Sequence, residues 1–164
     1  IEDEVHDKSR KYGMELPIGT WMGAVKVNND DVWDNYVKTG GFSHALLSLL
    51  RFHISMKNGC AYCTDMHYKE ARQAQVPEQK LHSTGFWNEV NYYSDEETTV
   101  LQWADCILQT NTQEQQRELA HSALKDLYST EQITQLTLAI CHINSWNIIS
   151  KGFGFEAGEY EVAG

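Results

Sequence analysis

The sequence is short of basic residues, of cysteine and of long apolar runs. Its 13 lysines and arginines face 23 acidic residues, for a formal net charge of -10. This acidic balance argues against nucleic acid or an anionic membrane as a partner. No apolar run approaches the roughly 18 residues that span a bilayer, and no signal-peptide pattern is visible. Four cysteines in 164 residues do not make a disulfide framework, so we expect a cytoplasmic protein.

The remaining composition and periodicity describe one helical domain. With 41% hydrophobic residues, no internal repeat and no convincing strand, the chain is predicted to be all-α. Apolar residues recur at helix spacing from Phe42 to Lys57, and Asn58-Gly59 ends that pattern. A second helix, which carries two cysteines, is predicted to run to about Gln75, and a short one to begin at Pro77.

Three later helices are predicted from capping boxes, in which a Ser or Thr is followed three residues later by Glu or Gln. The pairs are Ser94 with Glu97, Thr112 with Gln115, and Ser129 with Gln132. The helix after Ser129 is the longest and is apolar on more than one side, so we expect it in the core or at a subunit contact. It is predicted to end at Lys151 and Gly152.

The domain boundaries predicted from this pattern divide the chain into three parts. Residues 1–42 are expected to be an N-terminal extension that packs on the core, and residues 43–155 the helical core domain. Residues 156–164 form a C-terminal tail, and we expect the Gly-rich segment from Gly152 to be ordered only by packing on a neighbour.

The stretch that carries chemistry is Asn58-Gly59-Cys60-Ala61-Tyr62-Cys63-Thr64-Asp65-Met66-His67. On a helix, Cys60, Cys63 and His67 fall on one face, because offsets of three, four and seven residues bring side chains into register. The Asn-Gly break places Cys60 at or next to the helix N-terminus, where backbone N–H groups and the helix dipole favour a thiolate. His67, one turn after Cys63, is placed to take and return a thiol proton.

This arrangement is suited to redox chemistry. A thiol with a pKa near 8.5 is only about 3% ionised at neutral pH, and lowering its pKa by about two units requires roughly 2.7 kcal/mol. The thiolate could attack a peroxide, and the sulfenic acid formed would condense with the second thiol. Two alternatives stay open. A zinc site lacks a second ligand pair, and a structural role would make the cysteines small buried hydrophobes, as expected for Cys106 and Cys141.

The segment from Leu50 to Arg72 resembles the core motif of the alkyl hydroperoxidase D (AhpD)-like, or carboxymuconolactone decarboxylase, family. Residues 136–140 and 143–147 are similar to that family's final core helix. The resemblance implies an AhpD-like helical bundle that assembles as a dimer, trimer or hexamer. It also implies a peroxidase or disulfide reductase without metal or flavin, in which Cys63 attacks, Cys60 resolves and His67 belongs to a proton relay.

One departure from the family pattern bears on the relay. Family members with full peroxidase activity carry a glutamate twelve residues before the first motif cysteine, and that position is Ser48 in this chain. A serine hydroxyl cannot hold a proton as a carboxylate does. His44, one turn before Ser48, and Glu70, one turn after His67, are the candidate substitutes. His53 stands where relatives often carry arginine and is a candidate for tuning thiolate charge; the alternative is a surface histidine.

The sequence therefore predicts a thiol-dependent antioxidant oxidoreductase with a redox-active disulfide and no bound cofactor. Its expected partners are a hydroperoxide or disulfide substrate, a thiol reductant or redox protein, and further copies of itself. One alternative is a carboxymuconolactone decarboxylase-like lyase, whose chemistry does not need the thiol pair. For such a reaction Trp146 and Asn147 could line a pocket, although residues at this spacing are more often core. The other alternative is a non-catalytic oligomeric or zinc-holding protein.

Overall fold

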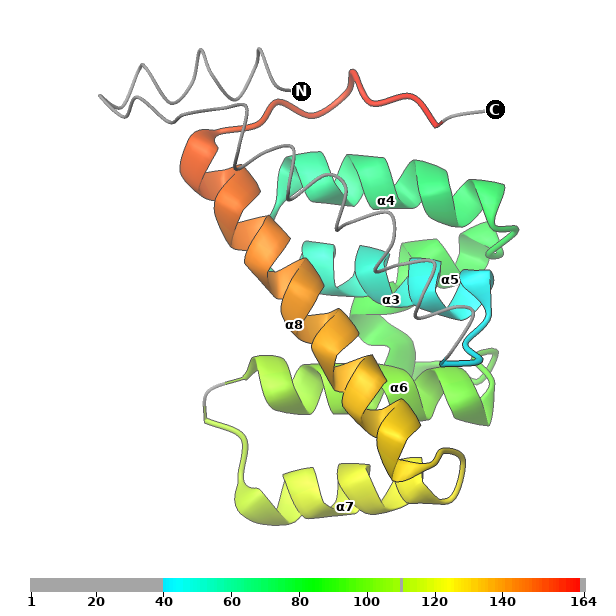
Figure 1. Cartoon of the computed structure of the whole chain (residues 1–164). Coiled ribbons are helices and arrows are strands. Elements are labelled where there is room, and N and C mark those ends of the chain that lie inside the picture. Colours follow the sequence, from blue (N-terminus) through cyan, green and yellow to red (C-terminus); the bar gives the residue numbers. More distant parts are fainter. Residues whose placement is uncertain (1–39, 110, 163–164) are drawn as a thin grey trace.

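The computed structural model describes residues 40–109 and 111–162, and every regular element within these ranges is helical. The elements, labelled as in Figure 1, are α3 (His44–Lys57), α4 (Ala61–Gln73), α5 (Glu78–Ser83), the 3-10 helix η1 (Thr84–Glu89), α6 (Asp95–Leu108), α7 (Glu114–Lys125) and α8 (Thr130–Phe153). The all-α prediction is confirmed. The predicted extension, residues 1–42, lies almost wholly outside the described residues, and the predicted domain boundaries stay predictions.

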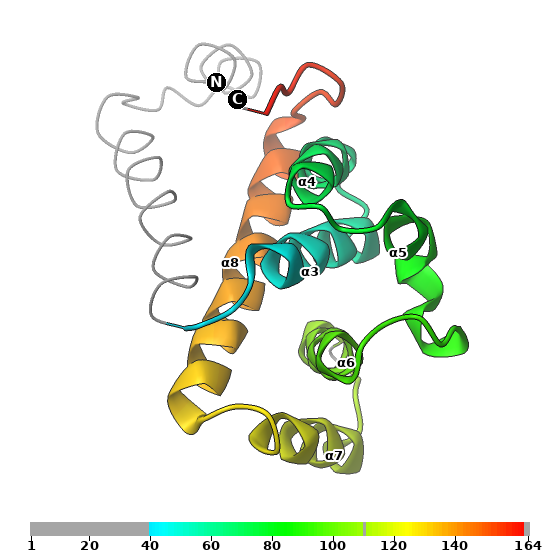
Figure 2. The same ribbon diagram turned by 90° about the vertical axis from the view of Figure 1, so that its right-hand side faces the viewer.

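The long helix α8 crosses the other helices obliquely, and α3 lies against its middle (Figures 1 and 2). The main core forms where these helices and α6 meet, around Leu50, Ile54, Val100, Leu136 and Ile140, all of which are buried. The predicted central position of α8 is therefore confirmed.

A second apolar cluster fills the other side of α3. Leu49 and Phe52 of α3 pack there with Ala71 of α4, Leu81 of α5 and Leu101 of α6. Helix α3 is thus buried on two faces, which fits its nearly continuous apolar sequence. This burial fixes α3 as the support on which α4, the cysteine-bearing helix, rests.

Local capping determines where two of the later helices begin. The boxes Ser94–Glu97 and Ser129–Gln132 are both formed, with side chain and backbone bonded reciprocally. The predicted box Thr112–Gln115 is wrong. Helix α7 begins at Glu114, and the hydroxyl of Thr112 donates instead to the carbonyl of Gln109, at 3.2 Å. The short polar side chain found a backbone partner in the preceding turn.

The C-terminal end of α8 also differs from its predicted position. The helix continues to Phe153, and Gly154 ends it with φ of 65°, a left-handed conformation that glycine adopts without steric cost. The segment beyond then turns back over α4 of the same chain, where Lys69 donates to the carbonyls of Gly158 and Tyr160 at 3.3 and 2.9 Å (Figure 1). The neighbour expected for the tail is therefore α4.

The two cysteines outside the motif are not buried as predicted. Cys106 is half-buried and Cys141 is exposed. Cys141 follows the buried Ile140 on α8, but it falls on the outer side of that helix, so its apolar surroundings in sequence did not imply burial. Within the described ranges, no helix is both long enough and apolar enough to cross a membrane.

Candidate functional site

The site begins at the tight turn between α3 and α4. Asn58 caps the end of α3, and Gly59 has φ of 61°, which a residue with a Cβ rarely adopts. Cys60 follows as the N-cap of α4, and its backbone N–H donates to the carbonyl of Ser55 at 3.1 Å. The predicted break at Asn58-Gly59 and the placement of Cys60 at the helix start are confirmed.

Helix α8 holds this turn in place. The amide of Asn58 donates to Asn144 and Asn147 at 3.0 and 2.8 Å, and Lys151 donates to the Asn58 carbonyl at 2.8 Å. The fully buried Asn147 donates in turn to the hydroxyl of Ser55, at 3.1 Å. Asn147, for which the sequence offered a pocket or a core position, thus anchors the backbone that presents Cys60.

Cys60 and Cys63 are joined by a disulfide, with their Cα atoms 5.3 Å apart. The backbone N–H of Cys63 donates to Sγ of Cys60 at 3.2 Å, so this sulfur takes the place of the usual N-cap oxygen. The same amide and the helix dipole would stabilise a Cys60 thiolate once the disulfide is reduced. Each cysteine is only 1% exposed.

His67 lies one turn beyond Cys63 and is almost completely buried, at 4% exposure. Its Nδ1 is 2.8 Å from Oε2 of Glu70. Burial lowers the pKa of His67, and the nearby charge of Arg51 lowers it further, although Glu70 opposes both effects. The imidazole is therefore held in its neutral form at neutral pH, with Nδ1–H donating to the carboxylate.

Glu70 gathers three donors from three parts of the chain. Oε2 is bonded to His67 and lies 3.3 Å from Nη1 of Arg51 on α3, and Oε1 accepts from the hydroxyl of Tyr160 at 3.0 Å. Burial alone raises the pKa of Glu70, but the His67 hydrogen bond, the Arg51 charge and the Tyr160 hydroxyl outweigh it, so the pKa is lowered. Glu70, one of two candidates named from sequence, is thus an ionised partner of His67.

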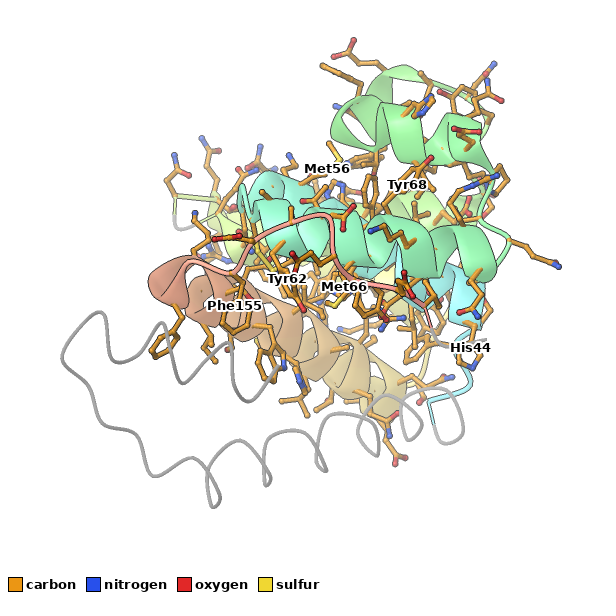
Figure 3. All side chains as sticks on the ribbon, turned by 90° about the horizontal axis from the view of Figure 1, so that it is seen from above. His44, Met56, Tyr62, Met66, Tyr68 and Phe155 are labelled. Atoms are coloured by element: carbon orange, nitrogen blue, oxygen red, sulfur yellow. A yellow bond between two sulfur atoms is a disulfide. The ribbon has the colours of Figure 1, made fainter. Side chains whose placement is uncertain are left out.

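Ser48, at the position of the missing family glutamate, is linked to Glu70 through Arg51. Ser48 is buried and its hydroxyl accepts from Nη2 of Arg51 at 3.2 Å, so it reaches Glu70 through the guanidinium. His44, the other candidate, is exposed in the first turn of α3, away from Tyr62 and Met66 in Figure 3. The structure therefore brings Glu70, and not His44, to His67.

His53 is neither at the surface nor joined to the thiol pair. It is fully buried, with Nε2 at 2.8 Å from Oδ1 of Asp105 and Nδ1 at 3.1 Å from the hydroxyl of Thr84. Asp105 also accepts from Trp87 at 3.1 Å and pairs with Lys57 at 3.3 Å. The surface interpretation is wrong, and these contacts of His53 join α3 to η1 and α6.

An open depression of about 780 Å³ lies beside the motif, between α3, α4 and α5. Its walls are mostly apolar and include Phe52, Met56, Tyr68 and Leu81, and Cys60 is the cysteine of the pair that lines it. Figure 3 shows Met56 and Tyr68 on the side of α4 that faces α5. A small organic molecule held there would lie next to Cys60.

For metal binding, the described residues contain no group of three or more His, Cys, Asp or Glu side chains placed to hold an ion.

Two of the residues that contact Glu70 were not predicted from the sequence. Arg51 lies inside the family-like segment but carries no spacing signal of its own, and Tyr160 comes from the tail, ninety residues beyond its partner. Only the folded arrangement brings them to Glu70.

Comparison with known proteins places the chain in a family. The sequence profile of the carboxymuconolactone decarboxylase family matches residues 24–105. An uncharacterised protein of Bacillus subtilis (strain 168), YdfG, is 35% identical over 124 residues, which cover 76% of this chain and 84% of YdfG. The chain belongs to the carboxymuconolactone decarboxylase family. The resemblance drawn from the Cys-x-x-Cys-x-x-x-His segment is confirmed.

Solved structures extend this family assignment to the fold. The crystal structure of ATU0492 from Agrobacterium tumefaciens, a protein of unknown function and a candidate AhpD antioxidant defence protein, superposes with a TM-score of 0.69 and 32% identity. The match covers 86% of this chain and 97% of ATU0492. The debrominase Bmp8 in its apo form matches with a TM-score of 0.62 over 96% of this chain and 86% of Bmp8, but at 18% identity, which supports the fold alone. The chain thus has the AhpD-like helical fold that the sequence predicted.

Proposed function

We propose that this family member is a thiol-dependent oxidoreductase that reduces hydroperoxides or disulfides through the Cys60–Cys63 pair, with His67 as proton carrier. The observation that carries the proposal is the disulfide at the N-terminus of α4, one turn from a buried His67–Glu70 pair. A lyase of this family would have no use for that arrangement. Other features support particular steps.

In the oxidising half of the cycle, the Cys63 thiolate attacks the terminal oxygen of a hydroperoxide, the O–O bond breaks, and the alcohol leaves with one proton. The Cys63 sulfenic acid then condenses with the Cys60 thiol and releases water. The assignment of Cys63 as attacking thiol follows the family resemblance. The 5.3 Å between Cα atoms supports the second step, because the two sulfurs can bond without rearrangement of α4.

His67 handles the protons of both steps. With Nδ1–H directed to Glu70, Nε2 is the nitrogen left to accept the Cys63 proton and to return it to the departing alkoxide. The lowered pKa of His67 supports a neutral base, and the carboxylate stabilises the imidazolium formed when the proton arrives. Glu70 thus takes over the relay role of the family glutamate that Ser48 replaces.

In the reducing half, an external thiolate attacks Sγ of Cys60 and expels Cys63, which takes its proton from His67. A second thiol then attacks the mixed disulfide, so that two thiols become one disulfide and the protein regains its dithiol. The apolar depression lined by Cys60 supports this direction of attack, because it would hold the organic part of the incoming thiol.

Thiol titration of the reduced protein with a stoichiometric hydroperoxide tests the proposal. We expect the four thiols per chain to fall to two, and Cys63→Ser to abolish this loss. In Cys60→Ser the reaction should stop at a sulfenic acid that dimedone labels on Cys63. Cys141→Ser, which removes an exposed cysteine outside the motif, is the matched control and should still lose two thiols.

Two results would contradict the proposal. One is a wild-type protein that keeps four thiols in excess hydroperoxide and in an organic disulfide. The other is a lactone decarboxylation that proceeds equally well in Cys63→Ser, which would instead support the lyase.

A further inference from the structure

The C-terminal segment, residues 155–162, lies along one stripe of α4 (Figures 1 and 3). The ring of Phe155 packs edge-on against that of Tyr62, with centroids 5.2 Å apart. The backbone N–H of Gly158 donates to Asp65 at 3.1 Å, and Asp65 is itself paired with Lys69 at 2.8 Å. Positions 62, 65 and 69 follow the three- and four-residue spacing of a single helix face. The segment is thus attached at successive turns of the helix that carries the site.

This attachment fixes where Tyr160 lies. Lys69 donates to the backbone carbonyl of Tyr160 at 2.9 Å. The side chain of Tyr160 then reaches Glu70, the residue after Lys69 on α4, and its hydroxyl donates to Oε1 of Glu70 at 3.0 Å. Burial and the negative charge of Glu70 raise the pKa of Tyr160 to about 12. The hydroxyl therefore keeps its proton at neutral pH and remains a donor.

The two oxygens of Glu70 have different partners. Oε2 faces His67 of its own helix and Arg51 of α3, whereas Oε1 faces the hydroxyl of Tyr160. These are the charged and titratable groups that act on the carboxylate from α3, α4 and the tail. A carboxylate held at both oxygens cannot rotate away from Nδ1 of His67, and each donor favours its ionised form.

We infer that Tyr160 is a positioning residue of the thiol site, carried by the C-terminal segment to hold Glu70 ionised and directed at His67. It touches neither sulfur and acts only through the carboxylate. The inference rests on the proposed function for its catalytic meaning, but the coupling of Tyr160 to Glu70 and His67 can be measured without any substrate.

The test is Tyr160→Phe, which removes only the hydroxyl. A hydrogen bond to a charged group contributes about 1.5 kcal/mol or more, so the pKa of Glu70, followed by its carboxyl ¹³C shift, should rise by about one unit. Reaction of the reduced protein with hydroperoxide should slow several-fold at neutral pH, and the acid limb of its pH profile should move upward, because the better-charged carboxylate raises the pKa of His67.

Tyr128→Phe is the matched control. Tyr128 also donates a tyrosine hydroxyl to a glutamate, Glu96, at 2.5 Å, but this pair joins α6 to the start of α8. The control should leave both the Glu70 titration and the reaction rate unchanged. An unchanged Glu70 pKa in Tyr160→Phe, or an equal shift in Tyr128→Phe, would overturn the inference.

A double-mutant cycle with Lys69→Met tests whether the segment acts as the carrier. Lys69→Met alone should reproduce part of the Glu70 shift, because it loosens the backbone beside Tyr160. In the Tyr160→Phe background it should add nothing, since the hydroxyl is already gone. Additive shifts would overturn the carrier role. If wild-type protein failed to react with hydroperoxide while Glu70 still shifted, the proposed function would fail and the Tyr160–Glu70 coupling would stand.

Discussion

Among the residues that the structure describes, two buried histidine–carboxylate pairs have the same length but differ in how they are built into the fold. His53 and Asp105 lie 2.8 Å apart, as do His67 and Glu70. The first pair spans 52 positions of sequence and joins α3 to α6, whereas the second lies within one turn of α4. A pair that bridges distant elements stabilises the fold, while a pair within one helix adds little to it and is available for chemistry.

The ring nitrogens show the same difference. In His53 both are engaged, because Nε2–H donates to Asp105 and Nδ1 can accept from the hydroxyl of Thr84. An imidazole bound on both sides exchanges a proton only by breaking tertiary contacts. In His67 the hydrogen bond to Glu70 occupies Nδ1, and the disulfide lies one turn away. Burial of a histidine therefore says little about its role until both nitrogens are assigned.

The largest effect expected from this comparison is on stability. His53→Ala should lower the free energy of unfolding by about 3 kcal/mol, because it leaves a cavity and a buried carboxylate without its donor. His67→Ala should cost less, about 2 kcal/mol, because it also leaves a cavity but its partner Glu70 keeps Arg51 and Tyr160. Urea unfolding of both oxidised variants measures the difference. Equal losses would show that the two pairs contribute equally to the free energy of unfolding and would contradict the comparison.

The second effect is on thiol reactivity, where His67→Ala should have the larger effect and His53→Ala the smaller. In His67→Ala the reduced protein should react with hydroperoxide about a hundredfold or more slowly, in line with the usual contribution of a general base. His53→Ala should react at nearly the wild-type rate at temperatures where it remains folded. The measurement is the loss of free thiols with time at neutral pH. A slow His53→Ala and a normal His67→Ala would reverse the assignment of the relay.

The features predicted correctly from sequence are those that a single helix contains. Cys60, Cys63, His67 and Glu70 are related by spacing alone, because helix periodicity places them on neighbouring turns. The break before Cys60 and the boxes at Ser94 and Ser129 are equally local. Such features need no knowledge of how the helices pack.

The features that sequence reasoning missed depend on that packing. Arg51 and Tyr160 reach the site from α3 and the C-terminal tail, and nothing in their local sequence marks them. Asn147 was named only as a pocket candidate, and its bond to Asn58 depends on how α8 packs. The prediction that Cys141 is buried and the surface interpretation of His53 were wrong for the same reason, since apolar or polar neighbours in sequence do not tell which side of a helix is covered. The exposure of both side chains is set by tertiary contacts.

The smallest expected effect is the acid dependence of stability, and it tests whether the two pairs are independent. Burial alone raises the pKa of Asp105, but the His53 hydrogen bond, the donor of Trp87 and the charge of Lys57 outweigh it, so the pKa is lowered. The pKa of Glu70 is lowered in the same sense. A carboxylate with a lowered pKa in the folded state stabilises the protein above its unfolded pKa of about 4. That contribution is lost as the pH falls through the folded pKa.

Replacing either carboxylate by its amide should therefore flatten the fall of stability below about pH 4. We expect Asp105→Asn and Glu70→Gln each to remove part of the decrease in unfolding free energy at acid pH, as measured by urea unfolding between neutral and acid pH. Because the two pairs share no hydrogen-bonding partner among the described contacts, the double variant should lose the sum of the two parts. A double variant that loses no more than one single variant would mean that α3, which carries both Arg51 and His53, couples them. The distinction between a pair that stabilises the fold and a pair that moves protons would then have to be drawn within one network.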